Sequence, residues 1–382
     1  MTRTDFRVPL VDLTAFHREL RTRAIERFSV VYDSGRFVLG PELRAFESEA
    51  AAQLGLAHGV GVSNGTDALV CALAALGIGR GKRIVTTPFT FVATASACLR
   101  TGAELQFVDL DPADLNLSPR CFAELDVSKV NAVVPVHLFG HPADVSKLRE
   151  LAPDCAIVED AAQAFGARRW GVGLGQHSDA VTFSFFPGKP LGGLGDGGLI
   201  GTRDAALAER CRALRTHGRD QRGEIQWLGG NYRLDELQAA ILRLKLPHEP
   251  RRTAQRAAHA RYYCEALSTI SEVSSPRTAA GCEPTWSVFS IRVLDGSRDR
   301  LKAHLHAAGV ETHVYYPRPL HLEPALRDLG YARGDFPEAE RASDQVLALP
   351  IHAELEPEQL AWVVASIASC YGYPSPDGPA IG

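Results

Sequence analysis

Between residues 50 and 202 the chain alternates short apolar runs with amphipathic segments, and this alternation limits the possible folds more than any other feature. It is typical of an α/β protein whose mostly parallel sheet is covered by helices on both faces. We predict strands at 58–63, 83–88, 105–110, 132–138, 156–160, 180–186 and 199–202. Amphipathic patterns predict helices at 66–77, 91–102, 144–152, 205–218 and 233–246.

Prolines interrupt the helical pattern at residues 246–252, and the order of elements changes there. Beyond this point we predict, in order, a helix at 251–267, a strand at 287–294, a helix at 298–309, a strand at 312–316 and two closing helices. The sequence therefore predicts a large domain over residues 1–248, which includes the N-terminal segment, and a smaller α+β domain over 249–382. The tail after about residue 373 has no core-forming pattern and is expected to be loose.

Charge and composition exclude several classes of function. The net charge of −4 offers no basic surface for nucleic acid or anionic membranes. No apolar run approaches the roughly 20 residues needed to cross a bilayer, and no signal peptide is evident, so we expect a cytoplasmic protein. The eight cysteines form no CxxC pair and are expected to be reduced. His137 and His141 have no evident third ligand, so we expect no metal site.

Lys189 is the first candidate for chemistry. It lies in SFFPGKPLGGLGDGG (residues 184–198), between an aromatic run and a glycine-rich stretch. GLGDGG has the spacing of a dinucleotide fingerprint but leads into a predicted strand instead of a helix, so we do not assign that role. A desolvated lysine whose pKa falls by roughly 3 pH units becomes a nucleophilic amine able to form a Schiff base. The alternative is a loop lysine that points into water.

Two neighbouring junctions add an acid and an anion site. The strand at 156–160 ends on Glu159 and Asp160, and open α/β sheets bind ligands at the carboxyl ends of their strands. Residues 63–66 (Ser-Asn-Gly-Thr) join a strand to a helix, where free N–H groups and the Thr66 hydroxyl suit a phosphate. An ordinary helix N-cap without a ligand is the alternative.

An aromatic pair completes the set. Phe89 and Phe91 lie at the next junction between a strand and a helix, where one ring could stack on a flat ligand, although core packing is the more common fate of such residues. A phosphate site, an aromatic platform, a carboxylate and an amine at the junctions of one sheet together predict pyridoxal 5′-phosphate (PLP) as the ligand.

The same segments resemble a known family. SNGTDAL, TPFTFVATA, PVHLFGHPADV, VEDAAQAFGA, SFFPGKPLGGLGDGG, NYRLDELQAAIL, YYPRPLHL and ALPIHAEL occur in the order seen in the DegT/DnrJ/EryC1/StrS family of PLP-dependent sugar aminotransferases. The resemblance runs from about residue 8 to about residue 370. It implies the aspartate-aminotransferase fold (fold type I) and a homodimer with active sites at the subunit interface.

The resemblance also implies roles for individual residues. Lys189 would form the Schiff base, Asp160 would pair with the pyridine nitrogen, and Gln163 would contact the phenolic oxygen of the cofactor. The other implied cofactor contacts are Phe91 on the ring face, Gly65, Thr66 and Ser184 on the phosphate, and Asn231 from the second subunit. The reaction implied moves an amino group from L-glutamate to a 3- or 4-keto nucleotide-linked sugar, with 2-oxoglutarate as co-product.

A nucleotide-sugar carries a pyrophosphate, so a basic rim is expected. Candidate substrate contacts are Phe37, Arg219, Arg222, Tyr316, Arg318 and His321. For the arginines, a solvated surface position is the alternative.

The sequence departs from many family members at Pro190, Gly193 and 227–231, which weakens any analogy of substrate. Two other functions stay open: a PLP-dependent sugar dehydratase or lyase, and a non-catalytic PLP-binding or sensory protein. The family's dehydratases carry histidine in place of the Schiff-base lysine, so Lys189 favours amino transfer. The nucleotide, the position aminated and a possible cyclitol acceptor cannot be read from the sequence.

Overall fold

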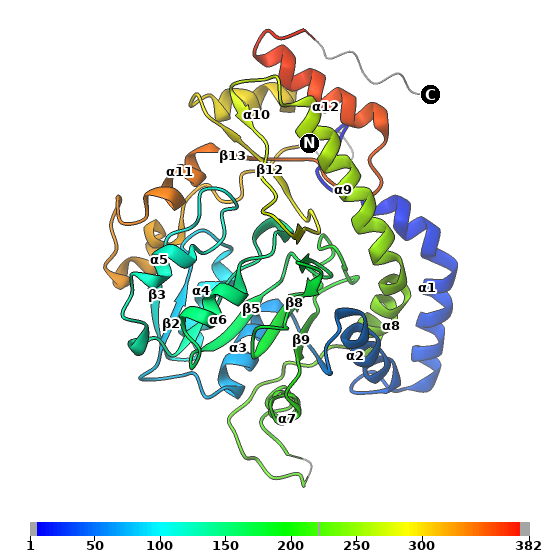
Figure 1. Cartoon of the computed structure of the whole chain (residues 1–382). Coiled ribbons are helices and arrows are strands. Elements are labelled where there is room, and N and C mark those ends of the chain that lie inside the picture. Colours follow the sequence, from blue (N-terminus) through cyan, green and yellow to red (C-terminus); the bar gives the residue numbers. More distant parts are fainter. Residues whose placement is uncertain (1–5, 221, 375–382) are drawn as a thin grey trace.

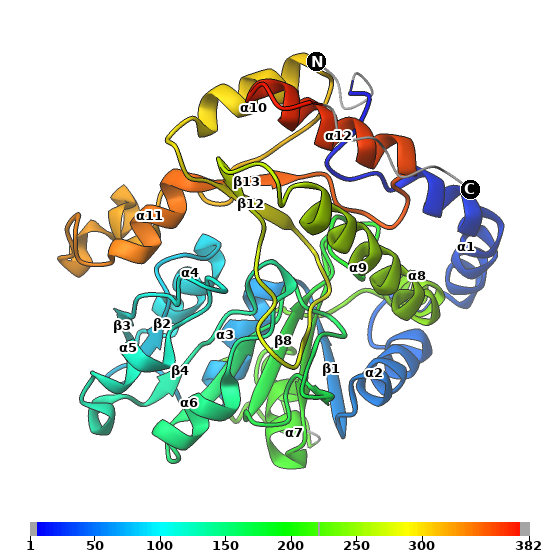
Figure 2. The ribbon, with the colours of Figure 1, turned by 45° about the horizontal axis from the view of Figure 1, so that its top comes forward.

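The structure, a computed structural model, describes residues 6–220 and 222–374. Its largest sheet has seven strands in the order β1-β9-β8-β5-β4-β2-β3 (Figures 1 and 2). The strands are β1 (His58–Val62), β2 (Arg83–Thr86), β3 (Glu104–Phe107), β4 (Ala132–Val133), β5 (Ala156–Asp160), β8 (Ala180–Ser184) and β9 (Gly198–Thr202). Pairing is parallel from β8 through β5, β4 and β2 to β3, whereas β9 runs antiparallel to both of its neighbours. The seven predicted strands and the mostly parallel sheet are confirmed.

Helices flank this sheet. They are α1 (Thr14–Ser34), α2 (Pro41–Leu54), α3 (Gly65–Ala75), α4 (Val92–Arg100), α5 (Pro119–Ala123), α6 (Val145–Leu151), α7 (Ala205–Leu214) and α8 (Glu236–Lys245). The five predicted helices correspond to α3, α4, α6, α7 and α8. The apolar helix α3 contacts β8 and β9, while α2 and α1 pack on α8. Every residue of β9 is buried, as expected of a central strand covered on both faces. Short 3₁₀ turns lie at Val127–Lys129 and Leu138–Gly140.

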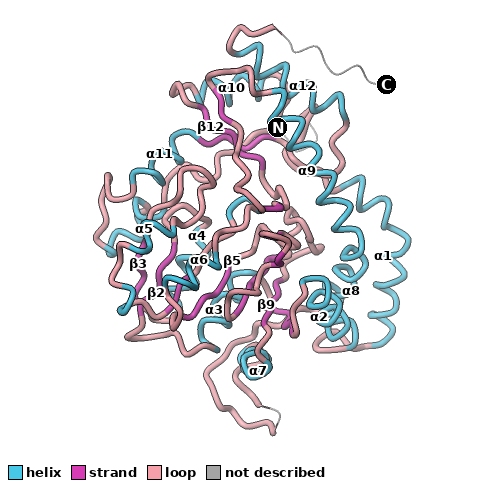
Figure 3. Tube along the Cα trace, viewed as in Figure 1, coloured by secondary structure: helices cyan, strands magenta, loops and turns pink. Residues whose placement is uncertain are grey.

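The C-terminal part begins with a 3₁₀ turn (Leu246–His248) and the long helix α9 (Glu249–Ala266). Strands β10 (Val273–Ser274), β12 (Phe289–Val293) and β13 (Val346–Leu349) form a three-stranded antiparallel sheet. Around it lie α10 (Arg298–Ala307), α11 (Pro337–Gln345), α12 (Pro357–Cys370) and 3₁₀ turns at Leu320–Leu322 and Pro324–Leu329. The tube in Figure 3 shows α10 and α12 side by side above this sheet, and Figure 2 agrees.

The predicted strand at 312–316 was wrong. The structure has only an isolated bridge there, between His313 and Ala348. Beyond this bridge the Tyr316 ring packs edge-on against Phe89, at 5.8 Å between ring centroids. Leu320 N then donates to Pro88 O at 2.7 Å, which holds the segment beside the carboxyl end of β2.

The predicted division into two domains stays a prediction. Helix α9 begins at Glu249, at the predicted boundary. Two features link the halves: Val8 forms a parallel bridge with Val310, and a third small sheet joins β11 (Cys282–Glu283) to β6 (Arg168–Arg169) and β7 (Val172–Gly173). Most of the tail predicted to be loose, residues 375–382, lies outside the described residues.

Two chemical expectations can be compared with the structure. All eight cysteine thiols are free. Within residues 6–220 and 222–374 no helix combines the length and the apolar character needed to span a membrane.

Candidate active site

Asp160 ends β5 with its carboxylate buried. Thr94 Oγ1, in the first turn of α4, donates to Asp160 Oδ2 at 2.7 Å, and Ala162 N donates to Oδ1 at 3.2 Å. Thr90 Oγ1 lies 3.1 Å from Thr94 Oγ1 and continues this chain of hydroxyls. Among the described residues, no lysine, arginine or histidine forms an ion pair with Asp160. The site thus contains a buried carboxylate without a protein cation.

Lys189 lies in the turn after β8, where its N–H donates to Phe186 O at 2.8 Å. Its side chain is half-buried. Burial lowers the pKa of the Lys189 ammonium, and the negative charge of Asp160 partly opposes this decrease. The structure therefore places the predicted nucleophile within the field of the predicted acid, with less water than an exposed lysine has.

Gly65 and Ser184 meet where the start of α3 faces the end of β8. A Cβ on Gly65 would lie 2.8 Å from Ser184 Cβ and 3.4 Å from Ser184 Oγ, so only glycine permits this approach. Asn64 caps the helix by accepting from Asp67 N at 2.8 Å. The first intrahelical bond comes from Ala68 N, so the N–H groups of Gly65 and half-buried Thr66 precede it and can face an anion.

An aromatic cluster stands beside Asp160. The Phe91 ring, 58% exposed, lies 6.3 Å from the Tyr316 ring, which also contacts Phe89 edge-on at 5.8 Å. Burial and the charge of Asp160 raise the pKa of Tyr316, while a side-chain hydrogen bond with Gln163 partly opposes this. Tyr316, predicted as a substrate contact, is thus brought against the predicted cofactor residues.

Gln163 is held by two hydrogen bonds from residues that the sequence analysis did not identify. Its Oε1 accepts from Phe139 N at 2.5 Å, and Phe139 adopts a positive φ of 59°. Thr285 Oγ1 donates to the backbone oxygen of Gln163 at 2.9 Å. Neither contact has a signal in the sequence, because Phe139 acts through its backbone and Thr285 lies more than a hundred residues away.

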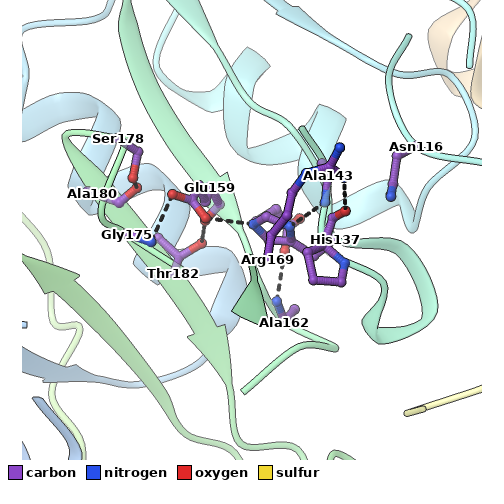
Figure 4. Close-up of polar contacts among 12 residues, drawn as sticks. Asn116, His137, Ala143, Glu159, Ala162, Arg169, Gly175, Ser178, Ala180 and Thr182 are labelled. Atoms are coloured by element: carbon purple, nitrogen blue, oxygen red, sulfur yellow. Dashed lines mark hydrogen bonds and ion pairs between the residues drawn. The ribbon is translucent and has the colours of Figure 1, made fainter. Parts of the chain in front are cut away.

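His137, considered above as a possible metal ligand, forms a buried hydrogen bond with Glu159. Its Nε2 lies 2.7 Å from Glu159 Oε2, with both side chains buried (Figure 4). Ala143 N donates to His137 Nδ1 at 2.9 Å, so the ring proton sits on Nε2 and points to the carboxylate. Glu159 Oε1 also accepts from Gly175 N at 2.9 Å. Successive strand residues face opposite sides of a sheet, so the adjacent acids Glu159 and Asp160 serve different surroundings.

Asn231 and the candidate arginines Arg219 and Arg222 lie in one segment between α7 and α8. The residue after Asn231 contacts the start of the predicted phosphate site, where Ser63 N donates to Tyr232 O at 2.9 Å. Residues 216–220 and 222–230 extend past α7 (Figure 1). Asn231 is exposed and forms an antiparallel bridge with Thr216. Arg219 donates to Gly223 O at 3.1 Å, and Arg222 N donates to Asp220 Oδ1 at 2.8 Å. Among the described residues, no hydrogen bond or ion pair joins these three side chains to Lys189.

The remaining substrate candidates have mixed positions. Phe37 is 45% exposed, and its backbone oxygen accepts from Glu236 N at 3.0 Å. Arg318 is exposed, 3.7 Å from Glu323. His321 is buried, and its Nε2 lies 3.1 Å from Glu340 Oε1. The His321 imidazole is therefore occupied by Glu340 and is too buried in this structure to contact a substrate.

The residues present fit PLP. Asp160 is a buried carboxylate that lacks a cation within the described residues, as a protonated pyridine nitrogen requires. The close approach of Gly65 to Ser184 beside free helix N–H groups suits a phosphate. The lowered pKa of Lys189 suits an amine that attacks a carbonyl.

Comparison with known proteins agrees with this arrangement. The chain is 42% identical over 363 residues to a dTDP-3-amino-3,4,6-trideoxy-alpha-D-glucose transaminase of Streptomyces venezuelae (94% of this chain, 95% of the relative). It is 43% identical over 362 residues to the erythromycin biosynthesis sensory transduction protein EryC1 of Saccharopolyspora erythraea (94% of this chain, 98% of the relative).

Solved structures give the same picture. S. venezuelae DesV in complex with a ketimine intermediate superposes with a TM-score of 0.92 at 42% identity, covering 95% of this chain and 98% of DesV. Bacillus subtilis NtdA with bound PMP superposes at 0.86 and 27% identity, covering 93% of this chain and 82% of NtdA. The model of the DegT/DnrJ/EryC1/StrS aminotransferase family matches residues 18–368. The chain belongs to this family and is a PLP-dependent aminotransferase.

Proposed function

We propose that the protein transfers an amino group from L-glutamate to a 3- or 4-keto sugar carried on a nucleotide. The observation that carries this proposal is a buried Asp160 that forms no ion pair within the described residues and whose charge acts on Lys189, whose pKa burial lowers. The relatives named above, which include a dTDP-aminosugar transaminase, support the class of acceptor.

Each residue of the cluster has a role in this proposal. The bound cofactor supplies a ring that withdraws electrons from the substrate and carries the amino group between the two half-reactions. Asp160, oriented by Thr94, holds the ring nitrogen protonated. Gln163 holds the phenolic oxygen, Phe91 covers the ring face, and Gly65, Thr66 and Ser184 bind the phosphate. Lys189 would accept the proton from the donor Cα and then return it, acting as base and then as acid.

A homodimer would complete the site. Asn231 is exposed in one chain, and its loop carries the exposed apolar side chains of Trp227 and Leu228, the latter 96% exposed. A groove of about 550 Å³ between α1 and α8 also exposes Phe28 and Leu194. Exposed apolar surface of this kind marks an interface. We propose that a second copy covers it and that Asn231 reaches the partner's cofactor phosphate.

The acceptor would enter from the rim. Phe37, Arg219, Arg222 and Arg318 are exposed, and the arginines suit a pyrophosphate. The segment carrying Arg219 and Arg222 projects from the chain, so in a dimer it would serve the partner's site.

The absorption spectrum of the purified holoprotein tests the donor half-reaction. A Schiff-base band that gives way to the pyridoxamine form on addition of L-glutamate, with release of 2-oxoglutarate, is the expected result. Lys189→Ala should fold, lack the band and lack turnover. Acceptors are then screened as dTDP- and UDP-linked 3-keto and 4-keto sugars. A band that glutamate leaves unchanged would contradict the donor assignment.

The same experiment separates the alternatives. A PLP-dependent sugar dehydratase or lyase would act on a sugar without releasing keto acid from glutamate. A non-catalytic protein would bind PLP and turn over neither substrate. The similarity to EryC1, named a sensory transduction protein, supports this second candidate.

A further inference from the structure

Helix α8 contacts the chain just after Lys189 at two points. Leu194 N donates to Gln238 Oε1 at 2.8 Å, and Lys245 Nζ donates to Gly192 O at 2.7 Å. Gln238 and Lys245 are seven residues apart, so they lie on one face of the helix, two turns from each other. One rigid element therefore holds both an N–H and a carbonyl of the same loop.

The loop has few means of fixing its own shape, because glycine backbone has many accessible conformations. A Cβ on Gly192 would lie 2.3 Å from Pro187 O, and one on Gly193 would lie 2.8 Å from Gln238 Oε1. The backbone thus packs closely against itself and against α8. Buried Leu191 and the bond from Gly193 N to Phe185 O at 2.8 Å hold part of the loop from within. Helix α8 adds two side-chain contacts from outside the loop.

The buried position of Lys245 is not explained by a contribution to folding stability. It is 6% exposed, and the partners of its Nζ are two neutral acceptors, Gly192 O and His17 Nε2 at 2.9 Å. Within the part of the chain that the structure describes, no carboxylate forms an ion pair with it. A buried charge without a counter-charge costs folding free energy. An apolar side chain of similar length would therefore fold at least as well, so stability does not explain the lysine.

We propose that Gln238 and Lys245 are positioning residues for Lys189. By holding Leu194 N and Gly192 O they fix residues 189–195, and thereby keep the Lys189 amine at the carbonyl with which it reacts. This inference rests on the proposed role of Lys189 as the Schiff-base residue.

Two pairs of variants test the two anchors. Lys245→Met removes the donor at similar length, and Lys147→Met, at an exposed lysine paired with Glu150, is its control. Gln238→Met removes the acceptor, whereas Gln238→Glu keeps an acceptor oxygen and should restore wild-type behaviour. The Gln238 pair keeps the test decisive if Lys245→Met fails to fold.

The first measurement is hydrogen exchange of apoprotein peptides that cover residues 186–198. Exchange should be at least about tenfold faster in Lys245→Met and Gln238→Met, with unchanged protection of β5 and β9 and, at pH 7.5, a urea midpoint no lower than that of wild type. The second is the pH titration of the Schiff-base band in the holoprotein, together with the rate at which apoprotein forms this band with PLP. The titration should shift and the rate should fall about tenfold in both Met variants.

Unchanged exchange in both Met variants would overturn the proposed anchoring. Faster exchange with a wild-type titration and rate would overturn the link to Lys189. If the wild-type protein forms no Schiff-base band, the proposed function fails together with this inference, and the exchange data alone would then show whether α8 holds the loop.

Discussion

The Thr94 hydroxyl donates to Asp160 Oδ2 at 2.7 Å, which joins the first turn of α4 to the end of β5 inside the site. Thr94→Val keeps the shape and removes this donor from a buried carboxylate, a loss of about 1–3 kcal/mol. We expect kcat/KM to fall by roughly 10- to 100-fold, since about 1.4 kcal/mol corresponds to a factor of ten. Steady-state kinetics and PLP titration provide the measurement.

Thr94→Ser is the matched control for this prediction, because it keeps the hydroxyl and loses only a methyl group. It should retain most of the activity. If Thr94→Val and Thr94→Ser have the same activity, then the hydrogen bond does not orient Asp160.

Gly65→Ala should weaken PLP binding at least about tenfold, because the new Cβ would lie 2.8 Å from Ser184 Cβ and force apart the two sides of the predicted phosphate site. Fluorescence titration of apoprotein with PLP measures this. In a Ser184→Gly background the opposing Cβ is absent, so Gly65→Ala should weaken PLP binding much less there. An equal loss of PLP affinity in the two backgrounds would argue against the steric explanation.

Glu236→Gln should destabilise the fold by about 1.5–3 kcal/mol. The buried carboxylate accepts from Gly40 N at 2.8 Å, Glu42 N at 2.9 Å and Leu43 N at 3.0 Å, and so closes the start of α2 next to the segment of Phe37. A glutamine amide would turn a donor toward these N–H groups. Urea unfolding measures the change, and exposed Glu358→Gln should leave the midpoint within error.

The stability difference between wild type and Lys245→Met should depend on pH. Burial and the charge of Arg252 lower the pKa of Lys245 to about 8, whereas an unfolded lysine titrates near roughly 10.4. Between these values the unfolded chain binds a proton that the folded chain lacks, so the free energy of unfolding rises with pH by at most about 1.4 kcal/mol per pH unit. Urea unfolding of both proteins from pH 7.5 to 10 should show wild type gaining on the variant. A constant difference would contradict the lowered pKa.

The sequence predicted the sheet well because its strands are buried on both faces and read as apolar runs. It missed the helices α1, α2 and α5 and the short strands β6, β7, β10, β11 and β13, and it wrongly placed a strand at 312–316. That segment has the composition of a strand. Whether it forms one depends on whether it can pair with β13 and on where the Tyr316 ring packs. Tertiary packing decided both.

The candidate site, like the fold, was predicted only in part. Lys189 and Asp160 could be chosen from the residues themselves, because they lie at or after the ends of strands, where such sheets bind ligands. Gln163, and Phe91 in preference to Phe89, were chosen only through the resemblance to the family. The geometric partners of these residues could not be chosen in either way. Phe139 holds Gln163 through a backbone N–H, which no residue type reveals.

The sequence by itself determined the strands of the large sheet, five of the helices that flank it and the reactive groups Lys189 and Asp160 at their junctions, because hydrophobic periodicity and residue chemistry are local properties. Only the tertiary structure decided that Thr94 holds Asp160, that Glu236 closes α2, and that Lys245 holds Gly192. The partners in these contacts are separated by 66, 194 and 53 positions. They meet because the sheet order places distant segments side by side, and buried polar groups must then find their hydrogen bonds across elements.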